Sequence, residues 1–222
     1  CQREPLQYIL GTAQFMGVTL RAQPGALIPR NDTETLCEQA LARMQGRERV
    51  LDLCTGTGAL AIAIALQFPG AQVTAADISA DALAVARQNI ADTGARVTLR
   101  QGDLFAAAAG ERFDIIVSNP PYIPDGDIAG LDASVRDYEP HLALKGGVDG
   151  LDFYRAICAH WREALRPGGR LYFEVGIGQA DDVLRIMRAQ GFGDIEIVPD
   201  TAGIPRVVYG TLYDSVFDNG ES

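Results

Sequence analysis

The fold class of this chain follows from Val50-Leu51-Asp52-Leu53-Cys54-Thr55-Gly56-Thr57-Gly58. A short apolar strand over residues 50–53 runs into a glycine turn, and an apolar helix follows over residues 59–68. Pro69-Gly70 ends this helix, and a second apolar strand begins at Val73. Parallel strands need a crossover connection, which is usually a helix, so this order predicts a parallel α/β sheet.

The same alternation continues along the chain. Further strands are predicted at residues 97–99, 113–117 and 171–175, with helices at 79–90, 151–165 and 181–190. The last two strands, at residues 195–198 and 206–212, have no helix between them and predict an antiparallel pair. We therefore predict an α/β fold with a seven-stranded, mostly parallel sheet whose last strand is antiparallel.

The predicted organisation has three parts. Residues 1–31 are punctuated by Gly and Pro and predict a hairpin and linker. Residues 32–213 carry the sheet, beginning with a helix capped by Asp32 or Thr33. Residues 214–222 form a polar tail that we expect to fray.

Composition restricts the classes of protein that are compatible with this chain. It has 222 residues, 47% hydrophobic and 22% charged, with a net charge of -10. This acidic balance argues against broad nucleic-acid binding, and no apolar run is long enough to span a bilayer. Four scattered cysteines with no metal-ligand spacing predict reduced thiols, no metal site and a cytoplasmic protein without membrane contact.

Polar side chains close successive predicted strands, namely Asp52, Asp77, Asp103 and Asn119. In open α/β sheets the ligand binds beyond the carboxyl ends of the strands. The glycine turn is not a dinucleotide fingerprint, because Ala61 stands where the third glycine is required. Taken alone, Asp77 could instead cap a helix and Asp103 could instead form a turn. Because both stand at the ends of successive strands, we favour a ligand site.

Three carboxylates would repel a pyrophosphate but suit a cationic ligand. A nucleoside that carries positive charge and no phosphate is S-adenosylmethionine. We expect Asp77 to accept from its ribose hydroxyls and Asp103 to accept from the exocyclic amino group, with Leu104 packing on the base.

The stretch Ser118-Asn119-Pro120-Pro121-Tyr122-Ile123 follows the fourth predicted strand. Two prolines make the turn stiff, so the Asn119 side-chain oxygen and the Pro120 carbonyl can both be aimed outward as acceptors. Two acceptors beside the Tyr122 ring suit a planar NH2 group, as found on glutamine, adenine or cytosine. The alternative is a proline-rich turn with a packed tyrosine.

Motifs across nearly the whole chain resemble the HemK/PrmC protein-glutamine N5-methyltransferases, which modify class I peptide-chain release factors. The matching stretches are Pro5 to Ile9, Ile28-Pro29-Arg30 with Asp32-Thr33-Glu34, Asp52 to Gly58, Asn119 to Ile123, Glu139-Pro140 with Ala143-Leu144, Gly147 with Asp149 to Leu151, Tyr154-Arg155 and Arg206 to Val208.

This resemblance implies a Rossmann-like class I S-adenosylmethionine-dependent methyltransferase that acts on the glutamine of the Gly-Gly-Gln motif. We expect it to be a monomer without direct nucleic-acid contact. The expected catalytic residues are Asn119, Pro120 and Tyr122, and the expected substrate-binding residues are Asn119, Pro120, Pro121, Tyr122 and Arg30. Strand ends and resemblance together predict a cofactor site of Asp52, Cys54, Thr55, Gly56, Thr57, Gly58, Asp77, Asp103, Leu104 and Asn119.

Departures from the family pattern keep alternatives open. Cys54 stands where the release-factor enzymes usually carry glycine, as in relatives that methylate a glutamine of a large-subunit ribosomal protein. Asn31 replaces a usual proline, and the family's N-terminal helical docking domain is expected to be absent from these residues. A methyltransferase acting on amino groups of adenine in DNA or RNA is a third reading, which the acidic balance opposes, and a non-enzymatic binding module is a fourth.

Two more features lie near the expected site. Glu174 ends the fifth predicted strand, where it could face the pocket or pair with an arginine. Residues 124–150 exceed an ordinary connection and are a candidate lid or substrate loop.

Overall fold

A seven-stranded sheet forms the centre of the computed structural model, which describes residues 3–213. The predicted polar tail, residues 214–222, lies outside the described residues. The strands are β3 (Arg49–Leu53), β4 (Gln72–Asp77), β5 (Val97–Gln101), β6 (Phe113–Ser118), β7 (Leu165–Glu174), β8 (Phe192–Pro199) and β9 (Pro205–Leu212).

The strand order in the sheet is β5-β4-β3-β6-β7-β9-β8. Neighbours from β5 to β7 are parallel, whereas β9 is antiparallel to both β7 and β8. The predicted α/β sheet with an antiparallel last strand is therefore confirmed. One edge of the sheet collects the carboxyl ends of β3, β4, β5, β6 and β7 together with the beginning of β9.

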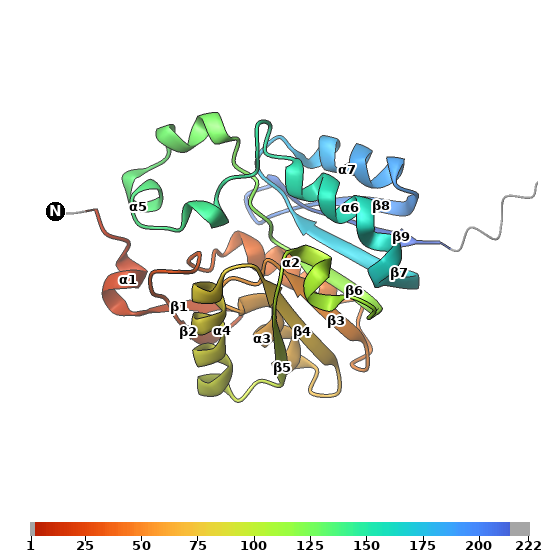
Figure 1. The fold of residues 1–222 in the computed structure, drawn as a ribbon, viewed down its shortest axis with the longest axis horizontal. Coiled ribbons are helices and arrows are strands. Elements are labelled where there is room, and N and C mark those ends of the chain that lie inside the picture. The colour runs from red at the N-terminus through yellow and green to blue at the C-terminus, as the bar shows by residue number, and fades with distance from the viewer. Residues whose placement is uncertain (1–2, 214–222) are drawn as a thin grey trace, which may run out of the picture.

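Helices cover both faces of the sheet (Figure 1). One hydrophobic core holds α2 (Asp32–Leu41) and α3 (Ala59–Gln67), and α4 (Ala80–Thr93) packs beside α3. The other core holds α6 (Asp152–Ala164), α7 (Ala180–Ala189) and the 3-10 helix η1 (Leu104–Ala108). Residues 59–65 of α3 are all buried, which explains why that helix is apolar on every side.

A separate hairpin lies before the sheet domain. It joins β1 (Thr12–Phe15) and β2 (Val18–Arg21) and follows the short helix α1 (Leu6–Leu10). Met16 and Gly17 at its tip both have positive φ, as a two-residue type I′ turn requires. The Met16 amide donates to Glu34, which ties the hairpin to α2, so the predicted N-terminal hairpin is confirmed.

Several predicted boundaries differ from those in the structure. The strand predicted at residues 171–175 is β7, which begins at Leu165 directly after α6 ends at Ala164, with a register shift before Arg170 that accommodates Pro167-Gly168-Gly169, and the strand predicted at residues 195–198 is β8, which begins at Phe192. Helix α2 begins at Asp32 after Asn31, without a side-chain cap. Its expected caps are used elsewhere, because Asp32 pairs with Arg206 and Thr33 accepts from Asn119.

Residues 124–150, which we call the covering segment, are not an open loop. They contain the 3-10 helices η2 (Asp125–Gly130) and η3 (His141–Ala143) and the single turn α5 (Ala133–Arg136). Within residues 3–213, no helix is both long and apolar enough to cross a membrane.

Candidate active site

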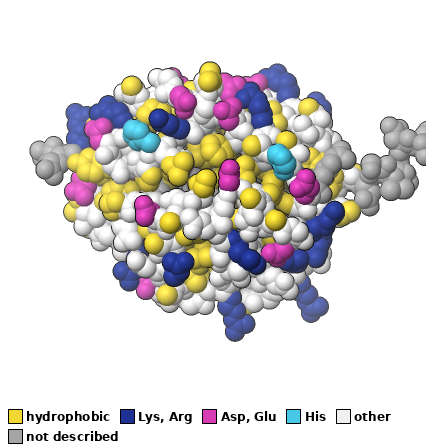
Figure 2. Space-filling model, viewed as in Figure 1, with side chains coloured by type: hydrophobic (Ala, Val, Ile, Leu, Met, Phe, Trp, Pro, Cys, Tyr) yellow, Lys and Arg dark blue, Asp and Glu magenta, His cyan; other side chains and the backbone are white. Residues whose placement is uncertain are grey.

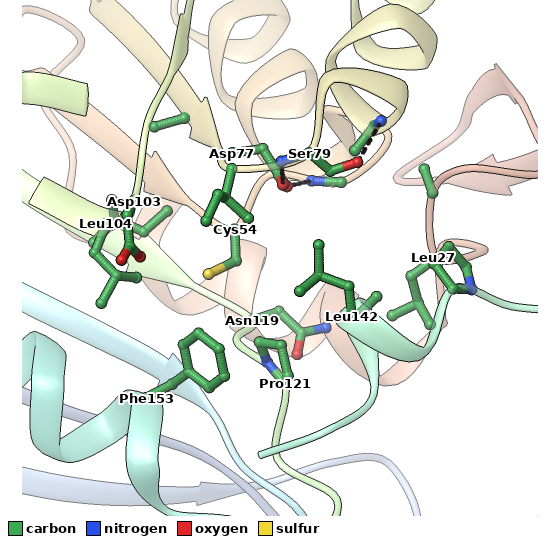
Figure 3. Close-up of a pocket in the computed structure, with 18 of the residues that line it drawn as sticks. Leu27, Cys54, Asp77, Ser79, Asp103, Leu104, Asn119, Pro121, Leu142 and Phe153 are labelled. Carbon is green, nitrogen blue, oxygen red and sulfur yellow. Dashed lines mark hydrogen bonds between the residues drawn. The ribbon is translucent and has the colours of Figure 1, made fainter. Parts of the chain in front are cut away.

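A partly open cleft of about 740 Å³, counting the solvent space at its mouth, lies at the carboxyl edge of the parallel strands. Figure 3 shows Asp77 and Ser79 on one side, Phe153 and Pro121 opposite, and Asp103-Leu104 and Leu27 toward the two ends. Hydrophobic side chains gather across the middle of the face seen in Figure 2, with most Lys and Arg around them. The predicted residues that line this cleft are Cys54, Gly56, Asp77, Asp103, Leu104, Asn119 and Pro121.

The glycine turn after β3 brings backbone to the cleft wall. Cys54, Gly56 and Gly58 have φ values of 61°, 56° and 83°, in the left-handed region that favours glycine. The Cys54 side chain lines the cleft (Figure 3). Burial, together with the charge of Asp77, raises the pKa of its thiol far above the ordinary range, so it stays protonated.

Asp77 fixes the turn from the neighbouring strand. Its two carboxylate oxygens accept from the Ser79 and Gly56 amides, each at 2.9 Å. Burial raises its pKa, and these backbone hydrogen bonds oppose the rise. Each oxygen keeps lone-pair capacity toward the cleft, so Asp77 can accept from two hydroxyls of a ligand.

Asp52 lies beneath the turn rather than in the cleft wall. Its Oδ2 accepts from the Thr55 hydroxyl at 2.5 Å and the Ala61 amide at 3.2 Å, while its Oδ1 has no hydrogen-bond partner among the described residues. Burial raises its pKa to about 7. Thr55, Thr57 and Gly58 are also buried behind the wall. Asp52, Thr55, Thr57 and Gly58 were all predicted to contact the cofactor. In the structure they shape the turn and do not reach the cleft surface.

The charge of the cleft restricts its ligand. None of the described residues that line it is Lys, Arg or His, whereas Asp77 and Asp103 are acidic. Leu27, Leu104 and Phe153 supply apolar surface. A phosphate would find no cation here, and a partly apolar cation such as S-adenosylmethionine fits this set of side chains.

The Asn119 to Tyr122 turn leaves two acceptors unused. Asn119 Nδ2 donates to the Thr33 hydroxyl at 3.2 Å, and among the described residues no hydrogen bond to Asn119 Oδ1 or to the Pro120 carbonyl is found. The Tyr122 hydroxyl donates to Glu174 Oε1 at 3.5 Å, and its carbonyl accepts from Gln179 at 2.9 Å. Pro120 is buried and Pro121 lines the cleft. The turn is therefore held from behind, and its two acceptor oxygens have no hydrogen-bond partner among the described residues.

Arg30 does not line the cleft. It forms an ion pair with Glu139 of the covering segment, whose other oxygen accepts from the Ile28 amide at 3.1 Å. The Glu139 side chain is 1% exposed and that of Arg30 is 36% exposed. This pair anchors the covering segment, which contributes Pro140, Leu142 and Ala143 to the cleft wall.

Sequence reasoning missed several residues of the site. Thr33 was assigned to a helix cap, and Leu27, Leu142 and Phe153 were not assigned to the cleft at all. The motif Asp32-Thr33-Glu34 was the available signal for Thr33. The apolar walls come from segments that are distant in sequence and have no local pattern of their own.

Known proteins are similar to this chain in sequence and in fold. Residues 31–134 match the family model "Methyltransferase small domain". The chain is 50% identical over 211 residues to a release factor glutamine methyltransferase of Geobacter sulfurreducens, covering 95% of this chain and 74% of that protein.

Solved structures share the fold. A release factor-specific protein-(glutamine-N5) methyltransferase from Alicyclobacillus acidocaldarius is 34% identical, with a TM-score of 0.52, covering 88% of this chain and 100% of that one. A methyltransferase from Pyrococcus furiosus is 19% identical, with a TM-score of 0.65, covering 89% and 90%, and supports the fold alone.

Proposed function

The chain belongs to the release factor glutamine methyltransferase family, and from this premise we propose that it methylates a glutamine side-chain amide in class I peptide-chain release factors. The methyl donor in this proposal is S-adenosylmethionine, and the target is the glutamine of the Gly-Gly-Gln motif. The single observation that carries the chemistry is the pair of unused acceptors, Asn119 Oδ1 and the Pro120 carbonyl, beside an acidic, cation-free cleft.

The residues that would hold the methyl donor follow from the cleft wall. Asp77 would accept from the ribose hydroxyls and Asp103 from the exocyclic amino group of the base, with Leu104 packed against its ring. Cys54 and Gly56 would let backbone approach the ligand closely. When bound, S-adenosylmethionine supplies an electrophilic methyl group on a sulfonium.

The turn would prepare the substrate amide. An amide nitrogen is a weak nucleophile because its lone pair is delocalised into the carbonyl. Asn119 Oδ1 and the Pro120 carbonyl would each accept one N–H, which fixes the nitrogen and stabilises the positive charge that develops on it. Tyr122 would pack on the amide plane, and the proton would leave to water.

Arg30 and the oligomeric state are separate proposals. The Arg30 guanidinium is 36% exposed beyond its ion pair with Glu139, which supports a contact with an acidic group of the substrate. We also propose that the chain is a monomer that does not contact nucleic acid directly, and light scattering and gel-shift titration test these two points.

Methyl transfer from labelled S-adenosylmethionine tests the function. The protein is incubated with a purified class I release factor, a glutamine-containing large-subunit ribosomal protein or DNA, and the modified residue is located by mass spectrometry. We expect label on the release-factor glutamine and none on a matched release factor with that glutamine changed to alanine. Label only on the ribosomal protein would overturn the proposal in favour of a ribosomal-protein glutamine methyltransferase, the alternative suggested by Cys54. Label only on DNA would also overturn the proposal.

A further inference from the structure

Asn89 is a buried amide on α4 whose side-chain polar atoms all have partners. It is 1% exposed, and it does not line the cleft. Its Oδ1 accepts from the Arg21 amide at 2.7 Å, and its Nδ2 donates to the Thr57 carbonyl at 3.0 Å and to the Arg21 carbonyl at 3.5 Å. Burying an amide costs free energy unless its donors and its acceptor are satisfied, so these partners show what Asn89 holds together.

One partner belongs to the glycine turn. Thr57 is 3% exposed and directly follows Gly56, which lines the cleft. At the next residue, a Cβ on Gly58 would stand 3.3 Å from the Cβ of Ala86 on α4. The helix is therefore packed closely against the turn, and the hydrogen bond from Asn89 fixes the turn one residue beyond the Gly56 amide that Asp77 holds.

The other partner belongs to the N-terminal hairpin. Arg21 is the last residue of β2, which lies beside α4 (Figure 1). Residues 25–27 follow shortly after the hairpin and line the cleft, with Leu27 at the end away from Leu104 in Figure 3. Ala82 and Val85 of α4 pack against Ala26. The same helix therefore carries two walls of the cleft, the glycine turn and residues 25–27.

An ion pair between Arg21 and Asp92 of α4 does not explain this attachment. Its two side chains are 50% and 46% exposed, and pairs this exposed contribute little to stability. Solvent and salt screen the hydrogen bonds of the buried Asn89 much less.

The Asn89 amide fits its surroundings in one orientation. If it were rotated by half a turn, Nδ2 would face the N–H of Arg21, and Oδ1 would face the carbonyl oxygens of Arg21 and Thr57. A single planar group thus holds both segments, and a shift of either one lengthens hydrogen bonds that also fix the amide for the other.

We propose that Asn89 is a positioning residue that holds the glycine turn and the N-terminal wall at a set spacing across α4, and so couples docking of the hairpin to binding of S-adenosylmethionine in the cleft. Asn89 acts through Thr57 and Arg21 and does not touch the ligand. The inference rests on the proposed function only for the identity of this ligand.

Asn89→Leu tests the role directly, because it replaces the amide by an apolar side chain of similar size and removes all three hydrogen bonds. We expect the Kd for S-adenosylmethionine, measured by calorimetry, to rise at least about 10-fold. The KM for S-adenosylmethionine should rise in parallel. At saturating S-adenosylmethionine kcat should stay within about 3-fold, because the Asn119 to Tyr122 turn is not attached to Asn89. A purely structural role would instead lower the fraction of folded protein and leave the Kd of the folded molecules unchanged.

Thr93→Val is the matched control on the same helix. The Thr93 hydroxyl donates to the main-chain carbonyl of Asn89 at 2.7 Å, so this variant also loses a hydrogen bond of α4 but keeps the Asn89 amide. We expect urea unfolding to show a loss of stability, with a Kd for S-adenosylmethionine within about 2-fold of the unaltered protein. An equal loss of affinity in Thr93→Val and Asn89→Leu would overturn the proposal.

Arg21→Pro tests the link from the hairpin. Proline removes the amide hydrogen that Asn89 accepts, whereas Arg21→Ala removes the same side chain and keeps that hydrogen. We expect Arg21→Pro to raise the Kd for S-adenosylmethionine at least about 3-fold and Arg21→Ala to leave it nearly unchanged. Equal Kd values would overturn the coupling. If Asn89→Leu does not fold, this pair decides the question by the same measurement.

Hydrogen exchange followed by mass spectrometry tests the coupling without turnover. Saturating S-adenosylmethionine should slow exchange in residues 18–22 of the unaltered protein and should not do so in Asn89→Leu, because coupling between two sites is reciprocal. Equal protection in both proteins, or an Asn89→Leu variant that folds and binds S-adenosylmethionine with an unchanged Kd, would overturn the proposal. Calorimetry and exchange use no release factor. If they give the expected results and no release factor is methylated, the proposed function fails while the role of Asn89 stands.

Discussion

Gly146 of the covering segment lies directly against Tyr122. A Cβ at position 146 would stand 2.7 Å from the Tyr122 Cα and 2.9 Å from the Pro121 carbonyl oxygen. The Gly146 amide donates to the Ile123 carbonyl at 2.8 Å. The turn that carries the two acceptors is therefore packed against the covering segment with no room for one methyl group.

Gly146→Ala should therefore displace the turn, lowering kcat at least about 10-fold and the free energy of unfolding by about 1 to 3 kcal/mol. Steady-state methylation and urea unfolding measure the two effects. Gly126→Ala is the matched control, because a Cβ there meets nothing within 4 Å. Equal behaviour of the two variants would show that the turn tolerates displacement.

Asn119→Ala should reduce methyl transfer at least about 100-fold, because it removes one of two acceptors for the substrate amide. Binding of S-adenosylmethionine, followed by calorimetry, should persist because Asp77 and Asp103 still line the cleft. Substantial turnover in this variant would contradict the role given to Asn119 Oδ1.

Asp77→Asn should weaken S-adenosylmethionine binding at least about 10-fold, because an amide cannot accept from both the Gly56 and Ser79 amides. The loss of a charge opposite a cationic ligand acts in the same direction. Asp181→Asn, an exposed aspartate on α7, controls for the change in net charge. The idea fails if both variants bind equally well.

Stability should depend on pH through Asp52. Burial raises its folded-state pKa to about 7 from 3.8, so between these values the folded chain holds a proton that the unfolded chain has released. The bound proton on Asp52 therefore stabilises the folded chain fully below the unfolded pKa. This contribution to the free energy of unfolding is lost as pH rises toward 7, by up to about 1.4 kcal/mol per pH unit.

Asp52→Asn removes this titrating group. The difference in free energy of unfolding between the variant and the unaltered chain should shift in favour of the variant as pH rises from about 4 to 7. Denaturant titrations at several pH values measure it. A difference that does not vary with pH would contradict the raised pKa.

Glu139→Gln should loosen the covering segment. The amide can still accept from Ile28 but loses the ion pair with Arg30, a change worth about 1 to 2 kcal/mol in a partly exposed pair. Hydrogen exchange should accelerate in residues 139–145. Asp137→Asn removes an exposed ion pair from the same segment and should leave exchange there unchanged.

The sheet and the polar strand ends were predictable because they follow from local patterns. Alternating apolar strands and helices specify a parallel sheet, and parallel strands bring their carboxyl ends to one edge. Asp77, Asp103 and Asn119 therefore reach the cleft as expected from their positions. The antiparallel end of the sheet followed from two strands without an intervening helix.

The rest of the site depends on contacts between distant segments. Asp52 sits behind the wall because positive φ at Cys54 and Gly56 turns the chain over it, and the sequence pattern does not reveal that direction. The ion pair of Arg30 with Glu139 spans 109 positions in the chain. Such a pair depends on how the covering segment docks, which no local propensity specifies.

The antiparallel strand β9 has a consequence for synthesis of the chain. It inserts between β7 and β8, so β8 has no partner in the sheet until β9 is made. Its reversed direction also brings Arg206 to Asp32 at the start of α2. A nascent polypeptide released before β9 therefore carries an unpaired β8 and lacks the arginine that pairs with Asp32 and Asp200, so we expect products of aborted translation to be prone to aggregate.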